Sequence, residues 1–416
     1  MNEITTHISD KITFNFLFKI VFFYLFFFLL LYIEPFSIGG RTIGVLWKIA
    51  FLAAVLLPVS VYIFKRKTIE PFVLFAILLS IKMLFNISSF EYFNSTISLV
   101  AKNLMFPMLF LFFIIKLNTE QLIYFAKHFS ILIVLSFVPY LIGILNPIAE
   151  GYDLSAYGVK ESFGLLGVFH QVHAAGISLG IALVVLFYFF QEEKNKTMRL
   201  IYILLIGLGT YEIILTYVRT GLLMALIGIF YLWMKEKESK KYITAIYFIV
   251  PAIFLVTYMY ITNPVLQMRI FDENIYNKHR ETGLDRLGSG RIIYAKTALV
   301  NWYEEGSVGH LMGLGFEYGK IKMGEAIGNK IFAHNNYVQM LQQEGLMGFV
   351  LFLLYLYSLL RYILRRKTNK FYSISMALAL AYLAEMLVQG NFLFPMFLLI
   401  SIFLALMKKT EIEYER

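Results

Sequence analysis

Cysteine is absent from the 416 residues of this chain. Disulfide bonds, thiolate nucleophiles, iron–sulfur clusters and cysteine-based zinc sites are therefore excluded. Any chemistry that the protein performs must use histidine, arginine, lysine, carboxylate or hydroxyl groups.

Charged residues are also scarce. They make up 15% of the chain, whereas 59% of the residues are hydrophobic and 17% are aromatic, and the mean hydropathy is +0.70. Soluble domains carry far more charge than this. The apolar residues form continuous runs and do not alternate with polar ones, which excludes a transmembrane β-barrel and predicts an all-α integral membrane protein.

Apolar windows of about 20 residues predict the membrane-spanning helices. We expect about twelve of them, near residues 12–33, 43–64, 70–87, 96–115, 121–145, 164–190, 199–217, 219–234, 242–262, 345–363, 371–390 and 392–407. The whole chain, residues 1–416, then forms a single polytopic membrane domain with one large loop at 263–344.

Basic residues mark one side of the membrane. The net charge is +10, but the lysines and arginines lie in short clusters between apolar runs, which is typical of topology signals and not of a nucleic-acid interface. The main clusters are KRK at 65–67, KEKESKK at 235–241, RRK at 365–367 and the lysines at 408–409. The positive-inside rule predicts both termini in the cytoplasm and the 263–344 loop, between the ninth and tenth helices, on the extracytoplasmic face.

The large loop is expected to be partly helical, because loops of this length rarely lack secondary structure. Within it, the run from Gly290 to Trp302 has the pattern of an amphipathic helix. Two carboxylates, Glu212 and Glu385, fall in the outer halves of apolar spans. Their short side chains reach the headgroups poorly, so we expect both to face a wet or paired interior, in a cavity that opens outward.

Three residues on the outer side carry the candidate chemistry. Arg219 lies in TYVRTGLL, Arg291 in LGSGRIIYAKTAL and His334 in AHNNYVQMLQQEGLMGF. A guanidinium group stays charged and binds phosphate oxygens through two hydrogen bonds, and an imidazole accepts a proton from a hydroxyl group near neutral pH. A structural role stays open for each residue: an interfacial anchor for Arg219, a helix start for Arg291 and a loop cap for His334.

No metal ion or other cofactor is predicted. The acidic residues of the outer loops are scattered, without a DxD pair, so a divalent-metal phosphate site is not indicated. His170 and His173 lie in GVFHQVHAAG with a spacing that does not fit a helical metal pair. We expect these two histidines to line the cavity or to bond to the backbone.

The motifs around these residues resemble those of the O-antigen ligase and polymerase superfamily. The resemblance is carried by VRTGLLMALIG, by SGR in the large loop, by GLGFEYG and by HNNYVQMLQQEGLMGFVLFL, and it covers most of residues 160–405. It implies a metal-independent, inverting glycosyltransferase of the bacterial plasma (inner) membrane. Such an enzyme moves a glycan from undecaprenyl pyrophosphate to an acceptor sugar hydroxyl on the outer face.

The resemblance also implies roles for the three residues. Arg219 and Arg291 would bind the pyrophosphate and stabilise the charge on the leaving group, and His334 would act as general base on the acceptor hydroxyl. Weaker candidates for substrate binding are Lys102, Lys82, His170, Asn335, Gln339 and Glu344. The implied partners are the lipid-linked donor, the glycan acceptor and membrane lipid, with chain-length regulator and flippase proteins as further candidates.

Several functions remain open. Within the superfamily we favour a repeat-unit polymerase over a ligase that transfers the chain to lipid A core or another acceptor, because lysine- and asparagine-rich usage is typical of a low-GC bacterium and the loop has no strongly basic patch for an anionic core. A flippase or other transporter of the same lipid-linked oligosaccharide would need ionisable residues on both sides of the midplane, whereas here they gather outward. A receptor or scaffold would not need an Arg, Arg, His set on one face.

Overall fold

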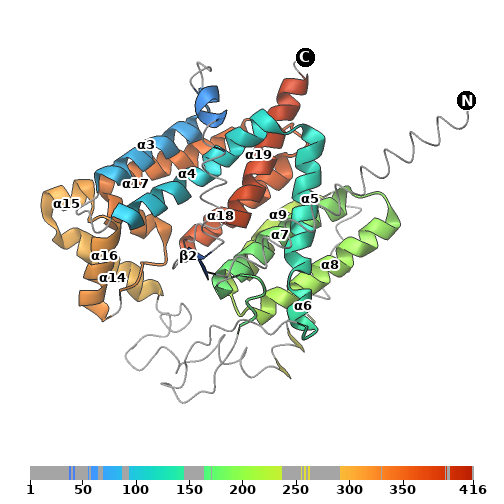
Figure 1. Cartoon of the computed structure of the whole chain (residues 1–416), viewed down its shortest axis with the longest axis horizontal. Helices are drawn as coiled ribbons and strands as arrows, with labels where there is room; N and C mark the ends of the chain where they lie inside the picture. Colours follow the sequence, from blue (N-terminus) through green and yellow to red (C-terminus); the bar gives the residue numbers. More distant parts are fainter. Residues whose placement is uncertain are drawn as a thin grey trace, which may run out of the picture.

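The computed structural model describes residues 37–38, 41–42, 55, 58–63, 69–86, 93–144, 164–169, 171–236, 254, 257–258, 261–262, 291–328, 330–388, 390 and 394–414. The predicted span 12–33 lies outside the described residues, as do most of the spans 43–64 and 242–262 and the side chain of His170. The described part of the chain is mainly helical (Figure 1).

The helices follow the predicted spans closely. They are α3 (Pro71–Phe85), α4 (Phe93–Lys116), α5 (Thr119–Leu135), α6 (Val138–Leu141), α7 (Val172–Glu192), α8 (Lys196–Leu215), α9 (Arg219–Lys235), α14 (Arg291–Glu304), α15 (Gly306–Met312), α16 (Phe316–Ile327), α17 (Asn336–Leu364), α18 (Tyr372–Val388) and α19 (Phe394–Tyr414). Two short strands, β1 (Ser37–Ile38) and β2 (Arg41–Thr42), pair antiparallel. The amphipathic helix predicted in the large loop is confirmed as α14.

Within the described residues, five helices are long and apolar enough to cross a membrane. They are Thr96–Lys116 of α4, Thr119–Leu141, α7, α8 and α17, and the apolar helices α3 and α18 are shorter. This composition supports an all-α, multi-pass membrane protein. The count of twelve spans and their orientation remain predictions.

Two predicted boundaries are wrong, those of the spans 164–190 and 392–407. The predicted span 121–145 corresponds to the candidate span Thr119–Leu141, in which a turn at Ser136 and Phe137 separates α5 from α6 just before Pro139, a residue that cannot donate a backbone hydrogen bond. The span 164–190 begins only at Val172, since Gly167 has a φ of +55° and the segment before it is not helical. The last helix continues to Tyr414 beyond its predicted end near residue 407.

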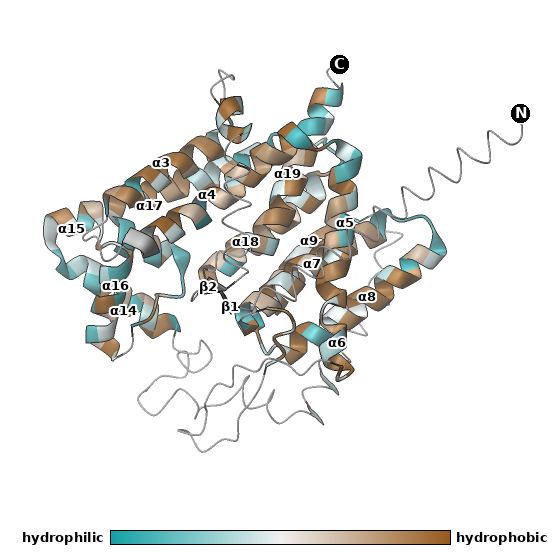
Figure 2. Ribbon diagram, in the orientation of Figure 1, coloured by the Kyte–Doolittle hydropathy of each residue, from teal (hydrophilic) through white to brown (hydrophobic). Residues whose placement is uncertain are grey.

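Helix α7 lies at the centre of one half of the bundle and packs against α5, α8, α9 and α18. Of its apolar window, 83% is buried inside the protein, against 39% for α8, so α8 has more surface free to face lipid. Figure 2 shows the corresponding brown, apolar helices in the middle of the molecule and more hydrophilic residues at the helix ends and on α14 to α16.

Glycines allow α7 and α9 to approach closely. A Cβ atom on Gly221 of α9 would collide with the backbone oxygen of Gly176, and one on Gly180 of α7 would collide with the backbone oxygen of Gly221. Only residues without a side chain fit where two helix backbones meet in this way. The crossing fixes the first turn of α9, which begins at Arg219.

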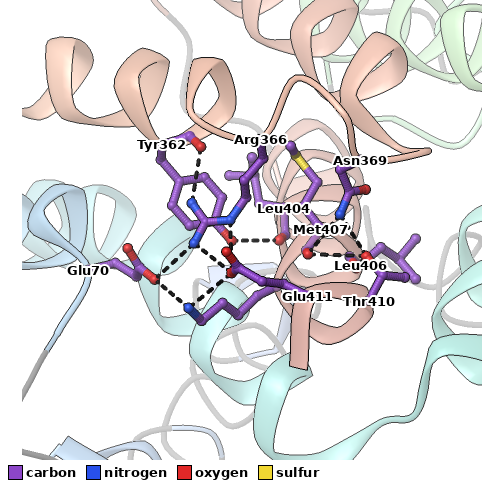
Figure 3. A network of polar contacts seen from close by, with 10 residues as sticks. Glu70, Tyr362, Arg366, Asn369, Leu404, Leu406, Met407, Thr410 and Glu411 are labelled. Atoms are coloured by element: carbon purple, nitrogen blue, oxygen red, sulfur yellow. Dashed lines mark hydrogen bonds and ion pairs between the residues drawn. The ribbon is translucent and has the colours of Figure 1, made fainter. Parts of the chain in front are cut away.

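A polar network joins Glu70, just before α3, to Arg366 after α17 and to the last part of α19 (Figure 3). Arg366, after α17, donates to Glu411 of α19 through Nε (3.1 Å) and Nη2 (2.9 Å). Lys408 lies 3.4 Å from Glu70 and 3.2 Å from Glu411, and the guanidinium group of Arg366 stacks 3.9 Å from the ring centroid of Tyr362. The network places the 365–367 and 408–409 clusters beside the residues that precede α3, in agreement with their predicted location on one membrane side.

The α7–α9 crossing can be tested with a pair of alanine substitutions. We expect Gly221→Ala to destabilise the protein by about 1–3 kcal/mol, because the new methyl group forces the two backbones apart. Gly207→Ala on α8 is the matched control, since a Cβ there meets nothing within 4 Å and alanine favours the helix by about 0.5–1 kcal/mol. Thermal unfolding of the purified protein should give a lower Tm for Gly221→Ala only; equal Tm values would contradict the crossing.

Candidate functional site

Arg219 stands at the tight turn between α8 and α9. Tyr217 in this turn has a φ of +56°, and the Thr216 hydroxyl accepts the backbone N–H of Val218 (3.2 Å) while donating to the carbonyl of Ile213 (2.7 Å). These bonds end α8 and start α9 within three residues. The Arg219 side chain is exposed at the N-terminus of α9, where the helix dipole adds to its positive field.

Arg291 is the first residue of α14. Helix α14 packs against α16 and α17. Ala298 of α14, Met323 of α16 and Ala333 before α17 form a small buried core. This core holds the loop helices against the membrane helices, and it orients the start of α14 relative to the segment that carries His334.

His334 occupies a strained position just before α17, with a φ of +50°. The next residue, Asn335, caps α17 by accepting the backbone N–H groups of Tyr337 (3.0 Å) and Val338 (3.1 Å). The Asn335 side-chain amide also donates to the carbonyl of Leu387 in α18 (3.1 Å). The start of α17 is therefore attached to the end of α18, and the imidazole of His334 lies with its ring centroid 5.8 Å from that of Tyr294.

The electrostatics bring the three predicted residues together. Burial lowers the pKa of Arg291, the positive charge of Arg219 lowers it further, and the carboxylate of Glu385 raises it. Burial and the charge of Arg291 lower the pKa of His334 to about 4. Because such charges act on one another only over short distances, Arg291 lies near both Arg219 and His334, and we call these three residues the Arg–Arg–His cluster.

Glu385 interacts with Arg291 but was not among the site residues predicted from the sequence. The sequence predicted a wet or paired interior for this carboxylate in a cavity that opens outward, and its side chain on α18 is fully buried. Its negative charge offsets part of the repulsion between the two arginines. The signal was present in the sequence, since a carboxylate in an apolar span usually has a cationic partner.

The chemistry that this arrangement allows is specific. Two guanidinium groups near each other provide positive charge suited to a di-anion with several oxygens. The neighbouring imidazole is neutral at pH 7, so it has a lone pair to accept a proton. The site can therefore bind a phosphorylated group and remove a proton from a nearby hydroxyl group.

Lys82 and Glu344, two of the weaker candidates, contact each other. The Nζ atom of Lys82 lies 3.2 Å from Oε2 of Glu344, and the side chains are only 5% and 2% exposed. Asn86 donates to the same carboxylate oxygen (2.9 Å). The carbonyl of Met312 accepts from both Lys82 (2.6 Å) and Asn86 (2.9 Å). These four residues form what we call the Lys82–Glu344 clamp, between α3, α15 and α17.

The clamp coincides with a break in α17. Gly345 has a φ of +64° and is not helical. The N–H groups of Leu314 and Gly315 donate to the carbonyls of Gln342 (2.9 Å) and Gln343 (2.8 Å). A Cβ atom on Gly313 or Gly345 would collide with the backbone of the other segment, which explains the glycines of the GLG and EG motifs.

The remaining weaker candidates are dispersed. Gln339 is buried on α17 and its amide donates to Gln343 Oε1 (3.4 Å). Lys102 is exposed on α4, and His170 lies outside the described residues. Arg291 therefore interacts electrostatically with Arg219 and with His334, and Asn335 follows His334 directly in the chain, whereas Lys82 and Glu344 belong to the clamp.

Residues 204–353 match the family model described as O-antigen ligase. The matched part contains Arg219, Arg291 and His334, and for that part the predicted resemblance to the O-antigen ligase and polymerase superfamily is confirmed. A search of curated proteins finds no match to the chain.

The clamp makes a prediction about stability. We expect Lys82→Met to cost about 3–5 kcal/mol, because Glu344 would be left buried without its cationic partner. The double variant Lys82→Met, Glu344→Gln should recover much of this loss, since the amide oxygen still accepts from Asn86. Lys322→Met is the matched control: its ion pair with Glu305 (3.4 Å) is partly exposed, and such surface pairs contribute little to stability. A loss for Lys322→Met as large as that for Lys82→Met, measured by thermal unfolding, would contradict the clamp.

Proposed function

We propose that the protein, of which residues 204–353 match the O-antigen ligase family, is a polymerase of polysaccharide repeat units. It acts as a metal-independent, inverting glycosyltransferase on the outer face of the bacterial plasma membrane. It transfers a glycan from undecaprenyl pyrophosphate to a hydroxyl group of an acceptor sugar. Chain-length regulator and flippase proteins are its proposed partners in the membrane.

The observation that carries this proposal is the convergence of two arginines and a neutral histidine from three separate elements. Arg219 begins α9, Arg291 begins α14 and His334 precedes α17. Each residue alone fits a structural role, as an interfacial anchor, a helix start or a loop cap. These separate roles do not require the three residues to lie near one another. Two guanidinium groups held near each other are costly unless an anion joins them, and a pyrophosphate diester fits that requirement.

The proposed reaction is a single displacement. Arg219 and Arg291 bind the pyrophosphate, and His334 accepts the proton of the acceptor hydroxyl as its oxygen attacks the anomeric carbon. The new glycosidic bond forms on the face opposite the leaving group while the bond to the pyrophosphate oxygen breaks, so the anomeric centre inverts. The arginines stabilise the charge that develops on the departing lipid pyrophosphate, a contribution larger in the transition state than in the bound donor.

The low proton affinity of His334 in the free protein suits this sequence of events. With its pKa at about 4, the imidazole is neutral before substrate arrives. A bound pyrophosphate would neutralise the field of Arg291 and thereby raise the pKa of His334. The base would thus become stronger when the donor is in place, which favours proton transfer only in the loaded site.

The weaker candidates keep different proposed roles. Lys102, exposed on α4, is a proposed contact for phosphate, and His170 and Gln339 are proposed to contact the glycan. Asn335 positions His334 through the cap of α17. Lys82 and Glu344 act on the site through the clamp and the break in α17.

A ligase is the second candidate, because the description of the matched family model is O-antigen ligase. A ligase would use the same donor, the same two arginines and the same base. It would differ in the acceptor, which would be lipid A core or another molecule and not a second lipid-linked repeat unit.

The first experiment compares polysaccharide size on gels from cells that carry wild type, His334→Ala or Arg291→Ala. We expect both variants to be inactive at normal membrane levels, because the base or the phosphate contact is lost. Single repeat units accumulating on the carrier would identify the polymerase, whereas long unattached chains on the carrier would identify a ligase.

The matched control is Lys296→Ala, which removes an exposed positive charge from the same helix as Arg291. It should leave chain length and surface attachment unchanged. Normal polysaccharide in the His334→Ala cells would refute the general base and favour a transporter or scaffold.

The histidine also predicts the pH dependence. A general base must be unprotonated to act. As the pH falls, kcat/KM should therefore stay constant until it declines with a midpoint at about 4, the pKa of His334 in the free protein. An unperturbed histidine would give a midpoint near 6.5. The profile is measured with purified protein, with tryptophan fluorescence at each pH to show that the fold is intact. A midpoint near 6.5 in folded protein would contradict the assigned environment of His334.

A further inference from the structure

Helices α14 and α15 expose an apolar surface that the proposed reaction does not use. It consists of Leu299, Val300, Tyr303, Val308 and Leu311, which we call the α14–α15 patch. Val308 is 77% exposed and Tyr303 is 74% exposed. Apolar side chains exposed together in this way usually mark an interaction surface.

The turn between the two helices has separate apolar and polar sides. The His310 ring lies between Trp302 and Tyr303, at centroid distances of 5.0 and 5.9 Å. Trp302 Nε1 donates to the carbonyl of His310 (3.2 Å), and His310 Nε2 lies 2.7 Å from the carbonyl of Tyr303. On the polar side, Glu305 pairs with Lys322 of α16 (3.4 Å). The turn is therefore well ordered, and its apolar exposure is not the result of a missing internal contact.

The clamp determines where α15 lies along the length of α3 and α17. The carbonyl of Met312, the last residue of α15, accepts from Lys82 and Asn86 at the outer end of α3. Gly313 lies against the backbone of Gln343 and Gly345 at the break in α17. Figure 1 shows α15 beside α17, at the edge of the molecule far from α7 to α9.

The patch continues an apolar surface of the membrane helices. Directly after the break, α17 exposes Leu346, Met347 and Val350, and α3 exposes Leu84 and Phe85 at its outer end. Helix α17 is long and apolar enough to cross the membrane, so its exposed apolar side chains face lipid. Val308 and Leu311 lie on α15, which the Lys82–Glu344 clamp attaches next to these exposed residues of α3 and α17.

We propose that the α14–α15 patch lies in the outer interface of the bilayer, with Val308 and Leu311 among the acyl chains. Trp302 and Tyr303 then lie at the headgroup level, where aromatic residues with a polar end are favoured. The contact holds α14, and with it Arg291, at the depth of a lipid-borne phosphate. The proposal rests on the membrane span and the exposed residues and not on the transfer reaction.

Spin-label accessibility tests this contact directly. Because the natural chain has no cysteine, Val308→Cys and Leu311→Cys each give a single nitroxide site in the full-length protein. The labelled protein is placed in vesicles of phosphatidylethanolamine and phosphatidylglycerol. Collision rates are measured with oxygen, which concentrates in lipid, and with a water-soluble nickel complex.

Two further labelling sites serve as references for lipid and for water. Val350→Cys on the lipid-facing side of α17 is the lipid reference, and Glu325→Cys on α16, whose native side chain is 63% exposed, is the water reference. We expect the labels at 308 and 311 to collide more often with oxygen than with the nickel complex, as the label at 350 does. The label at 325 should collide more often with the nickel complex. Labels at 308 and 311 that favour the nickel complex would overturn the proposal, because the patch would face water. Labels that exclude both reagents would also overturn it, because protein would cover the patch.

Discussion

The buried ion pair between Lys82 and Glu344 is the interaction on which the arrangement of α3, α15 and α17 depends. Two charges with almost no exposed surface are stable only when their remaining hydrogen-bonding capacity is used. Here Asn86 and the carbonyl of Met312 complete the arrangement. The clamp therefore specifies where α3, α15 and α17 meet, and any other register would leave a buried charge alone.

The break in α17 follows from the same contact. At Gly345 the helix changes direction, and the backbone of Leu314 and Gly315 bonds to carbonyls released by the break. The segment Asn336–Glu344 thus forms a separate first part of α17, whose cap at Asn335 bonds to Leu387. Because His334 directly precedes this cap, the clamp and the cap together fix the position of the proposed base relative to α18.

The Arg–Arg–His cluster gains its chemistry from the low solvent access that this packing creates. In water, two arginines and a histidine would each keep their ordinary proton affinity and repel one another weakly. In the protein, burial and then the charge of Arg219 lower the pKa of Arg291, and burial and then the charge of Arg291 lower the pKa of His334 and keep it neutral. Glu385 offsets only part of the positive charge. The cluster is therefore ready for an anionic substrate before that substrate binds.

The sequence predicted much of this arrangement, because hydropathy marks apolar helices and arginine and histidine are conspicuous near an apolar bundle. It predicted α14 and the three principal residues. It did not reveal that Lys82 and Glu344, 262 residues apart in the chain, neutralise each other, because a local pattern contains no information about such a tertiary contact. For the same reason the sequence did not reveal the break of α17 at Gly345, which lies within a glycine motif. It predicted Glu385 as an interior carboxylate but not its interaction with Arg291.

The central claim is that His334 removes the acceptor proton while the arginines hold the donor. The most direct measurement is the single-turnover rate of glycan transfer by purified protein in liposomes, with a lipid-pyrophosphate donor and EDTA, for wild type and His334→Ala. Donor binding is measured in parallel. The account predicts that the rate falls by about 10²–10⁴-fold, the usual contribution of a general base, while donor affinity changes little. An unchanged rate, or a loss explained entirely by weaker donor binding, would contradict it.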